Sequence, residues 1–152
     1  MSRNNVIAYR FAKEINAPLD YVFQWCTDFS EDDPKITGSS SKRIILEKMK
    51  NRAIYVSLTP TAGNSTGGRV YLVDLAPPKA WHMEAHGNGF DSVGEYRLTR
   101  ISRERTRLAI AFKLRYYSLN VPTKEDRVKD SRSSWDKYVA ALERDYANSI
   151  PT

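Results

Sequence analysis

The segment HMEAH carries the side chains in this chain that most resemble metal ligands. His82, Glu84 and His86 stand at every second position, so on a strand they would share one face with about 6.6 Å between successive members. Imidazole and carboxylate groups bind zinc or iron. The alternating residues Trp81 and Met83 are apolar, however, and mark the opposite face as the buried one. We therefore expect hydrated polar side chains here and no metal.

Two other motifs favour structural roles over chemistry. The glycine-rich segment 63–68 lacks the lysine and the following helix of a phosphate-binding loop, and a flexible hairpin loop explains its glycines. Cys26 is the one cysteine, and it follows Val22 and Phe23 at helical spacing. That spacing predicts a core thiol and not a nucleophile. The sequence thus predicts no cofactor.

One acid and two tyrosines are the best candidates for catalysis. Asp74 has the strand parity of Val70 and Leu72, the residues expected to face a pocket. Tyr96 and Tyr116 carry phenols that can orient a ligand oxygen by hydrogen bonding. If the protein is an enzyme, these three would supply its acid–base chemistry. The alternative for Asp74 is a strand-end aspartate bonded to the following turn.

A run of strands between two helical regions must position these residues. The pattern at 6–15 predicts a strand, and Pro18 begins an apolar helix that reaches Thr27. The acidic segment 28–33, broken by Pro34, suggests a second short helix or turn. Short connections between the later strands favour antiparallel neighbours. Those strands are expected at 42–49, 53–59, 69–75, 80–86, 92–101 and 106–117, followed by an amphipathic helix near 122–149.

Alternation in the last strand predicts one buried and one hydrated face of the sheet. Leu108, Ile110 and Phe112 share the apolar parity, while Arg107 and Lys113 have the opposite one. The closing helix repeats large apolar residues at spacings of three and four, which gives it one apolar stripe. A pocket between that stripe and the sheet would be lined by Val56, Leu58, Val70, Leu72, Trp81, Met83, Tyr96, Leu98, Phe112, Leu114, Tyr116, Trp135, Tyr138, Val139 and Leu142.

Several short motifs resemble those of one known superfamily. The segment EINAPLDYVFQW at 14–25 contains "I-x-A-P" followed by "V-F-x-W", and an aspartate, Asp28, follows the helix. Further on, GEYRL at 94–98 and TRL at 106–108 are similar to the superfamily's penultimate hairpin. The chain therefore resembles the START-related polyketide cyclase superfamily, also called SRPBCC or helix-grip proteins, over nearly its whole length.

The resemblance implies an α+β helix-grip fold. Such a fold has a curved antiparallel sheet of about seven strands wrapped around a long C-terminal helix, with two short helices after the first strand. It also implies a hydrophobic pocket between sheet and helix. Members of the superfamily bind lipids, sterols, polyketides or other apolar molecules, and some are enzymes while others are carriers or sensors. The fold alone does not decide between these functions.

Composition narrows the class of protein further. The 152 residues suit one domain, 1–152, and no apolar run approaches the roughly 18 residues of a membrane span. The first residues lack the features of a signal peptide, and a single cysteine suits a reducing compartment, so we expect a cytoplasmic protein. The net charge of +6 raises the possibility of an anionic membrane surface or a protein partner, whereas nucleic acid is not expected. The basic residues for such a partner would be Arg97, Arg107, Lys113 and Arg115.

Three functional hypotheses follow from the sequence. The first is binding of a small hydrophobic or amphipathic ligand by a carrier, sensor or scavenger. The second is a cyclase- or dehydratase-type enzyme that acts in the same cavity. The third is a protein-interaction module that uses the basic outer face of the sheet.

Overall fold

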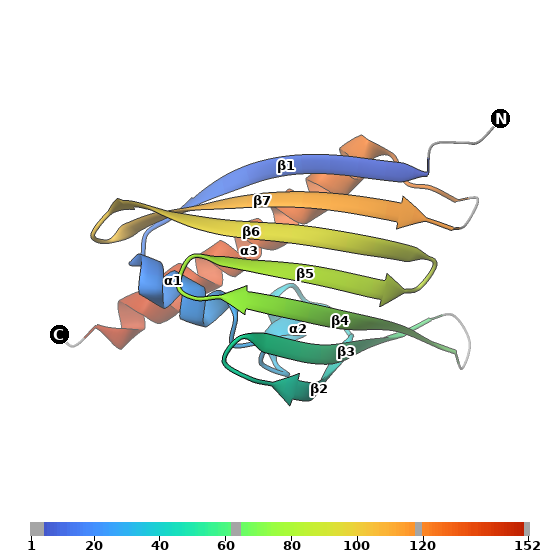
Figure 1. The fold of residues 1–152 in the computed structure, drawn as a ribbon, viewed down its shortest axis with the longest axis horizontal. Coiled ribbons are helices and arrows are strands. Elements are labelled where there is room, and N and C mark those ends of the chain that lie inside the picture. The colour runs from blue at the N-terminus through green and yellow to red at the C-terminus, as the bar shows by residue number, and fades with distance from the viewer. Residues whose placement is uncertain (1–4, 62–64, 118–119, 151–152) are drawn as a thin grey trace.

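A long helix crosses one face of a seven-stranded sheet in the computed structural model, which describes residues 5–61, 65–117 and 120–150 (Figure 1). The strands pair antiparallel in the order β1-β7-β6-β5-β4-β3-β2. Their short connections are those that a meander requires. The expected α+β helix-grip architecture is confirmed. Its elements are β1 (Val6–Ile15), α1 (Leu19–Cys26), α2 (Asp33–Ile36), β2 (Lys42–Lys48), β3 (Arg52–Pro60), β4 (Thr66–Ala76), β5 (Ala80–Gly87), β6 (Phe90–Ser102), β7 (Arg105–Tyr116) and α3 (Lys124–Ser149).

Some element boundaries differ from those expected. The glycine-rich loop was expected to last through Gly68, but β4 begins at Thr66, and Gly67 and Gly68 pair with β3. Residues 62–64 of that loop lie outside the described residues. The closing helix runs from Lys124 to Ser149, in agreement with the expected range near 122–149. Its start is fixed two residues after Pro122 because the Thr123 side chain accepts a hydrogen bond from the Asp126 backbone amide and caps the helix.

The core is closed where α1 and the C-terminal half of α3 meet the sheet. Ile15, Val22 and Leu108 are fully buried at that end, and Leu142 of α3 is buried with them. Hydrogen bonds also attach the helix: the Asn16 backbone amide donates to Glu143 at 2.9 Å, and the Trp25 indole donates to Asp145 at 2.9 Å. The terminal helix is thus fixed firmly over one end of the sheet.

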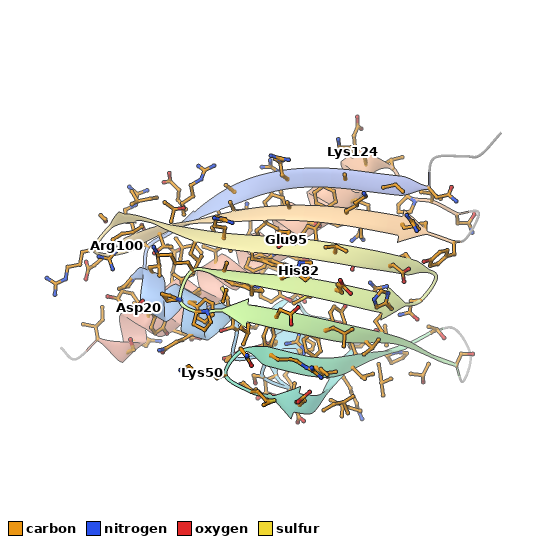
Figure 2. All side chains as sticks on the ribbon, in the orientation of Figure 1. Asp20, Lys50, His82, Glu95, Arg100 and Lys124 are labelled. Atoms are coloured by element: carbon orange, nitrogen blue, oxygen red, sulfur yellow. The ribbon has the colours of Figure 1, made fainter. Side chains whose placement is uncertain are left out.

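The predicted faces are confirmed on β5, β6 and β7. Leu108, Ile110 and Leu114 are buried, whereas Arg107 and Lys113 are exposed. The histidines of β5 lie on the outer face, as expected. Figure 2 shows His82 beside Glu95 of β6 on the side of the sheet opposite α3.

The faces predicted for β3 and β4 are wrong. Tyr55 and Tyr71 lie on the inner face, and Leu72, which alternates with them, is 39% exposed on the outer face. The prediction failed because these strands carry aliphatic side chains on the hydrated side and put two tyrosines and one arginine, Arg69, inside. Such side chains have large apolar parts of their own. The residues assigned to the wrong face are Val56, Leu58, Val70, Leu72 and Asp74.

Candidate functional site

A cavity of about 280 Å³ lies between the inner face of the sheet and the helices. Strands β1 to β7 all contribute to its wall, and α3 covers it with Arg127, Ser131, Trp135 and Tyr138. The cavity forms because α3 touches the sheet through large side chains that hold its backbone away from the strands. Tyr9 of β1 is an example: its hydroxyl is hydrogen-bonded to that of Ser131 at 2.5 Å.

Packed aromatic rings form one wall of the cavity. Tyr96 of β6 stacks on Trp81 of β5 with ring centroids 4.8 Å apart and nearly parallel planes. Phe112 meets the same tyrosine edge-on at 5.8 Å, and Trp135 of α3 lies 5.8 Å away. Gly94 leaves room for this cluster, because a Cβ atom there would come within 2.9 Å of Tyr96 and 3.0 Å of Phe112. All three tryptophans of the chain, Trp25 included, line the cavity.

The opposite wall is built from β2, β3 and β4 and is polar. Tyr55 stacks on Tyr71 with centroids 4.5 Å apart, and the Arg43 guanidinium lies 4.3 Å from the Tyr55 centroid. Arg43 also forms an ion pair with Asp33 of α2 at 2.6 Å. Burial, with Asp28 nearby, raises the pKa of Asp33 to about 6 although Arg43 acts in the other direction.

A second arginine on this wall, Arg69 of β4, is only 8% exposed. Its guanidinium donates to the carbonyl oxygens of Gly87 at 2.5 Å and Phe90 at 2.8 Å, and to the Ser92 hydroxyl at 3.0 Å. It also lies 3.6 Å from the centroid of the Phe90 ring. These contacts come from the β5–β6 turn region, so they hold a positive charge in a fixed position at one end of the cavity.

Three tyrosines and the cysteine of the wall have raised pKa values, so they stay protonated at neutral pH. Burial raises the pKa of Tyr55 and of Tyr96, and it also raises that of Tyr138. Burial likewise raises the pKa of Cys26, with Asp28 adding to the shift. Neutral phenols can donate hydrogen bonds to a ligand. A protonated thiol is a poor nucleophile. Cys26 is half-buried beside the core and lines the cavity, so it is not the fully buried core thiol that was expected.

The predicted pocket residues fall into three groups. Those that line the cavity are Trp81, Met83, Tyr96, Phe112, Leu114, Trp135 and Tyr138. A second group, Leu98, Tyr116, Val139 and Leu142, lies in or against the hydrophobic core beside it. The third group, Val56, Leu58, Val70 and Leu72, is on the outer face of β3 and β4.

The predicted catalytic group is not brought together. Asp74 is exposed on the outer face and pairs in register with His82, so it cannot act inside the cavity. Tyr116 is buried and stacks on Phe90 with centroids 5.0 Å apart, outside the cavity lining. Of the three candidates, Tyr96 alone lies in the wall.

The sequence reasoning missed the charged part of the site. Asp33, Arg43, Arg69 and Arg127 all line the cavity, and none stood out as a motif. A usable signal was present in β3 and β4, where placing the aromatic residues inward, and not the aliphatic ones, would have brought Arg69 inside with Tyr71. Arg127 and Asp33 lie on helices, and no strand pattern could have placed them.

The outer face carries both signs of charge. His82 is hydrogen-bonded to Glu95 and lies 3.4 Å from Glu84, and His86 is hydrogen-bonded to Asp91 at 2.9 Å. Over the part of the chain that is described, no three such side chains are arranged to hold a metal ion. The basic residues expected to meet a partner are exposed on this outer face among the acids; they are Arg97, Arg107, Lys113 and Arg115. That they bind a partner stays a prediction.

A strongly curved sheet closed by a terminal helix over an internal cavity defines the helix-grip class of proteins, and comparison with solved structures supports this assignment. Neither a scan against protein-family models nor a search of curated proteins gives a match. The Zhui aromatase/cyclase from Streptomyces sp. R1128 is similar with a TM-score of 0.72 at 18% identity, over 91% of this chain and 94% of that one.

Two further solved structures have the same fold. Ara h 8.0201 matches with a TM-score of 0.71 at 11% identity, over 95% of this chain and 99% of that one. A START superfamily protein from Mycobacterium smegmatis matches with a TM-score of 0.66 at 14% identity, over 94% and 99% of the two chains. The START-related resemblance seen in the sequence is therefore confirmed for the fold. None of the helices in the described ranges is long and apolar enough to cross a membrane.

Proposed function

We propose that the protein binds a small amphipathic organic molecule in the cavity, as a carrier, sensor or scavenger. The observation that carries the proposal is the lining itself, in which a wall of stacked aromatic rings faces a wall of arginines and tyrosines. Pockets with apolar walls and a few placed polar groups are the usual form of small-molecule sites. The solved structures of similar fold include an aromatase/cyclase and a START superfamily protein, which supports the same general function.

Burial of the ligand's apolar part would supply most of the affinity. Each 100 Å² of apolar surface removed from water contributes on the order of 2.5 kcal/mol before the cost of association. The polar wall would then set the orientation, since the phenols of Tyr55 and Tyr71 and the arginines offer hydrogen-bond donors.

N-phenyl-1-naphthylamine, a neutral fluorescent probe, tests this proposal directly. Because Trp25, Trp81 and Trp135 all line the cavity, a probe bound there should quench tryptophan emission and gain fluorescence by energy transfer. We expect saturable binding with both signals. Saturable probe fluorescence without tryptophan quenching would place the probe elsewhere and contradict the proposal.

Filling the cavity should abolish this binding. Gly94→Val would push the rings of Tyr96 and Phe112 into the space they border, and we expect the affinity for the probe to fall by tenfold or more. Val93→Leu is the matched control, because Val93 is the neighbouring residue on the outer face of β6. An unchanged affinity in the Gly94 variant, with its fold intact by near-ultraviolet circular dichroism, would count against the cavity as the binding site.

An enzyme of the cyclase or dehydratase type is the second candidate. The observation that favours it is Asp33, a carboxyl group of the cavity wall whose pKa is raised to about 6. A carboxylate with a pKa near the working pH is suited to accept a proton from a bound substrate. Catalysis predicts that Asp33→Asn abolishes turnover of a poly-β-ketone substrate while N-phenyl-1-naphthylamine still binds. Equal turnover in the wild type and the variant would exclude this role.

A further inference from the structure

Two arginines at the same end of the cavity form no ion pair with an acid in the described part of the chain. They are Arg69 of β4 and Arg127 of α3, and both line the cavity. Both guanidinium groups lie against the ring of Phe90, with their central carbons 3.6 Å and 6.0 Å from its centroid. Both also act on the buried phenol of Tyr116, where each counters the rise in pKa that burial causes. Strand and helix thus bring two positive charges to one place.

The third arginine of the cavity differs in this respect. Arg43 lies in register with Arg69 across the sheet, because Arg43 of β2 pairs with Ser57 of β3 and Ser57 pairs with Arg69 of β4. Its charge, however, is compensated by Asp33 at 2.6 Å. The excess positive charge in the cavity wall therefore belongs to Arg69 and Arg127.

Unpaired charge is unfavourable in such a setting. A buried cation needs either a counter-ion or hydrogen bonds to offset the loss of water. Arg69 has three neutral acceptors, the carbonyls of Gly87 and Phe90 and the hydroxyl of Ser92. Asp91 is near enough for Arg69 to help lower its pKa, but its carboxylate is hydrogen-bonded to His86 and Tyr117 and forms no ion pair with Arg69. The Nε of Arg127 is buried without any hydrogen-bond partner. The site therefore has both the charge and a free donor that an anion would satisfy.

We propose that the ligand is an amphipathic organic anion whose negatively charged group binds between Arg69 and Arg127. Its apolar body would lie along the aromatic wall toward Trp81 and Trp135, which continues from this end of the cavity. Guanidinium groups recognise carboxylates and similar planar or branched oxyanions by charge-assisted hydrogen bonds. This inference rests on the proposed function, because it assigns the ligand class and orientation for the same cavity.

A pair of probes isolates the contribution of the charge. 8-Anilinonaphthalene-1-sulfonate has the skeleton of N-phenyl-1-naphthylamine with one sulfonate group added. We expect Arg127→Gln to weaken binding of the sulfonate probe about tenfold or more, because a charge-assisted contact is lost. Binding of the neutral probe should stay within twofold of the wild type. Both affinities are measured by titration with tryptophan excitation.

Two further variants complete the test. Lys129→Gln removes the same charge from α3 at an exposed position outside the cavity lining, and it should leave both affinities unchanged. Arg69→Lys keeps the charge and loses the forked geometry, so it should weaken the sulfonate probe while keeping the fold, which near-ultraviolet circular dichroism verifies.

The outcomes separate the two proposals. Equal loss of both probes in Arg127→Gln, or no loss of either, would overturn the anion site but leave the cavity as a binding site. Binding of the neutral probe alone to the wild type would do the same. Failure of both probes to quench the tryptophans would overturn the proposed function, and the anion site with it.

Discussion

The two halves of the sheet present opposite chemistry to the cavity. On β5, β6 and β7 the large apolar side chains point inward, as with Trp81 and Phe112, and charged residues such as Lys113 point outward. On β3 and β4 the aliphatic residue Leu72 points outward, and Arg69 points inward. The faces thus differ from one half to the other, although the backbone alternates in the same way throughout: β3 and β4 bury Val73 inward as well, but they also place tyrosines and an arginine there and leave Leu72 outside.

This difference makes the cavity amphipathic. An interior lined only by the pattern of β5 to β7 would be a hydrocarbon core with no reason to remain open. The inward arginine and tyrosines of the other half supply fixed donors, and Arg43 of the adjacent β2 and Arg127 of α3 add two more. The protein satisfies these donors only in part, since the Nε atoms of Arg43 and Arg127 are buried without a hydrogen-bond partner. The difference between the halves therefore indicates a site for a molecule with one polar and one apolar end.

The difference between the two halves of the sheet is tested most strongly by making the same Leu→Ala substitution in each half. Leu108→Ala on β7 removes a fully buried side chain and should lower the free energy of unfolding by about 2–5 kcal/mol. Leu72→Ala on β4 removes a side chain that is 39% exposed and should cost less than about 1 kcal/mol. Urea denaturation of both variants measures the difference. Equal losses would mean that the outer face of β4 is covered in solution.

The polar wall of the cavity should also contribute most to the change of stability with pH under acidic conditions. The pKa of Asp33 rises from 3.8 to about 6 on folding, so between these values the folded state binds more protons than the unfolded state. Stability from this group is therefore full below about pH 4 and is lost as the pH rises through 6. The loss should be on the order of 1–2 kcal/mol.

Asp33→Asn provides the comparison for this pH dependence. The variant should show a smaller fall in the free energy of unfolding between pH 4 and 6, measured by urea denaturation at each pH. The fall should shrink and not vanish, because burial also raises the pKa of Asp28. A variant that loses stability as steeply as the wild type would contradict the assignment to Asp33.

Ionisable groups on the outer face of the sheet should have the smallest effect on the stability of the protein. Desolvation lowers the pKa of His82, but its hydrogen bonds with Glu95 and Glu84 outweigh this and raise the pKa above 6.5. Stability from His82 is thus present below pH 6.5 and is lost as the pH rises through the higher value. Solvent screening limits it to a few tenths of a kcal/mol. Nuclear magnetic resonance titration of His82, with His82→Gln for assignment, should show the raised pKa; a value below 6.5 would contradict it.

The sequence was sufficient for the fold and for half of the cavity. Period-two alternation in 106–117, the proline before α1 and the aromatic stripe of α3 are local signals. The first put Phe112 on the inner face of the sheet, the second marked the start of α1, and the third turned Trp135 toward the sheet. The half that contains β3 and β4 could not be predicted in the same way, because parity tells which residues share a face and not which face is inside. The choice of aliphatic over aromatic residues then put Asp74 in the cavity and left Arg69 out.

The charged site needed the three-dimensional arrangement. Arg127 is far from Arg69 in the chain, and both reach the ring of Phe90 only in the folded protein, Arg69 from β4 and Arg127 from the first turn of α3. Asp33 reaches Arg43 through the placement of α2 beside β2. No periodicity encodes such encounters between elements.

A crystal structure of the protein with 8-anilinonaphthalene-1-sulfonate would test the central claim most directly. The account predicts the probe inside the cavity, with its rings against the aromatic wall at Trp81 and Tyr96 and its sulfonate within hydrogen-bond distance of Arg69 and Arg127. A probe bound on the outer face of the sheet with the cavity unoccupied, or a probe in the cavity with its sulfonate turned away from both arginines, would contradict it.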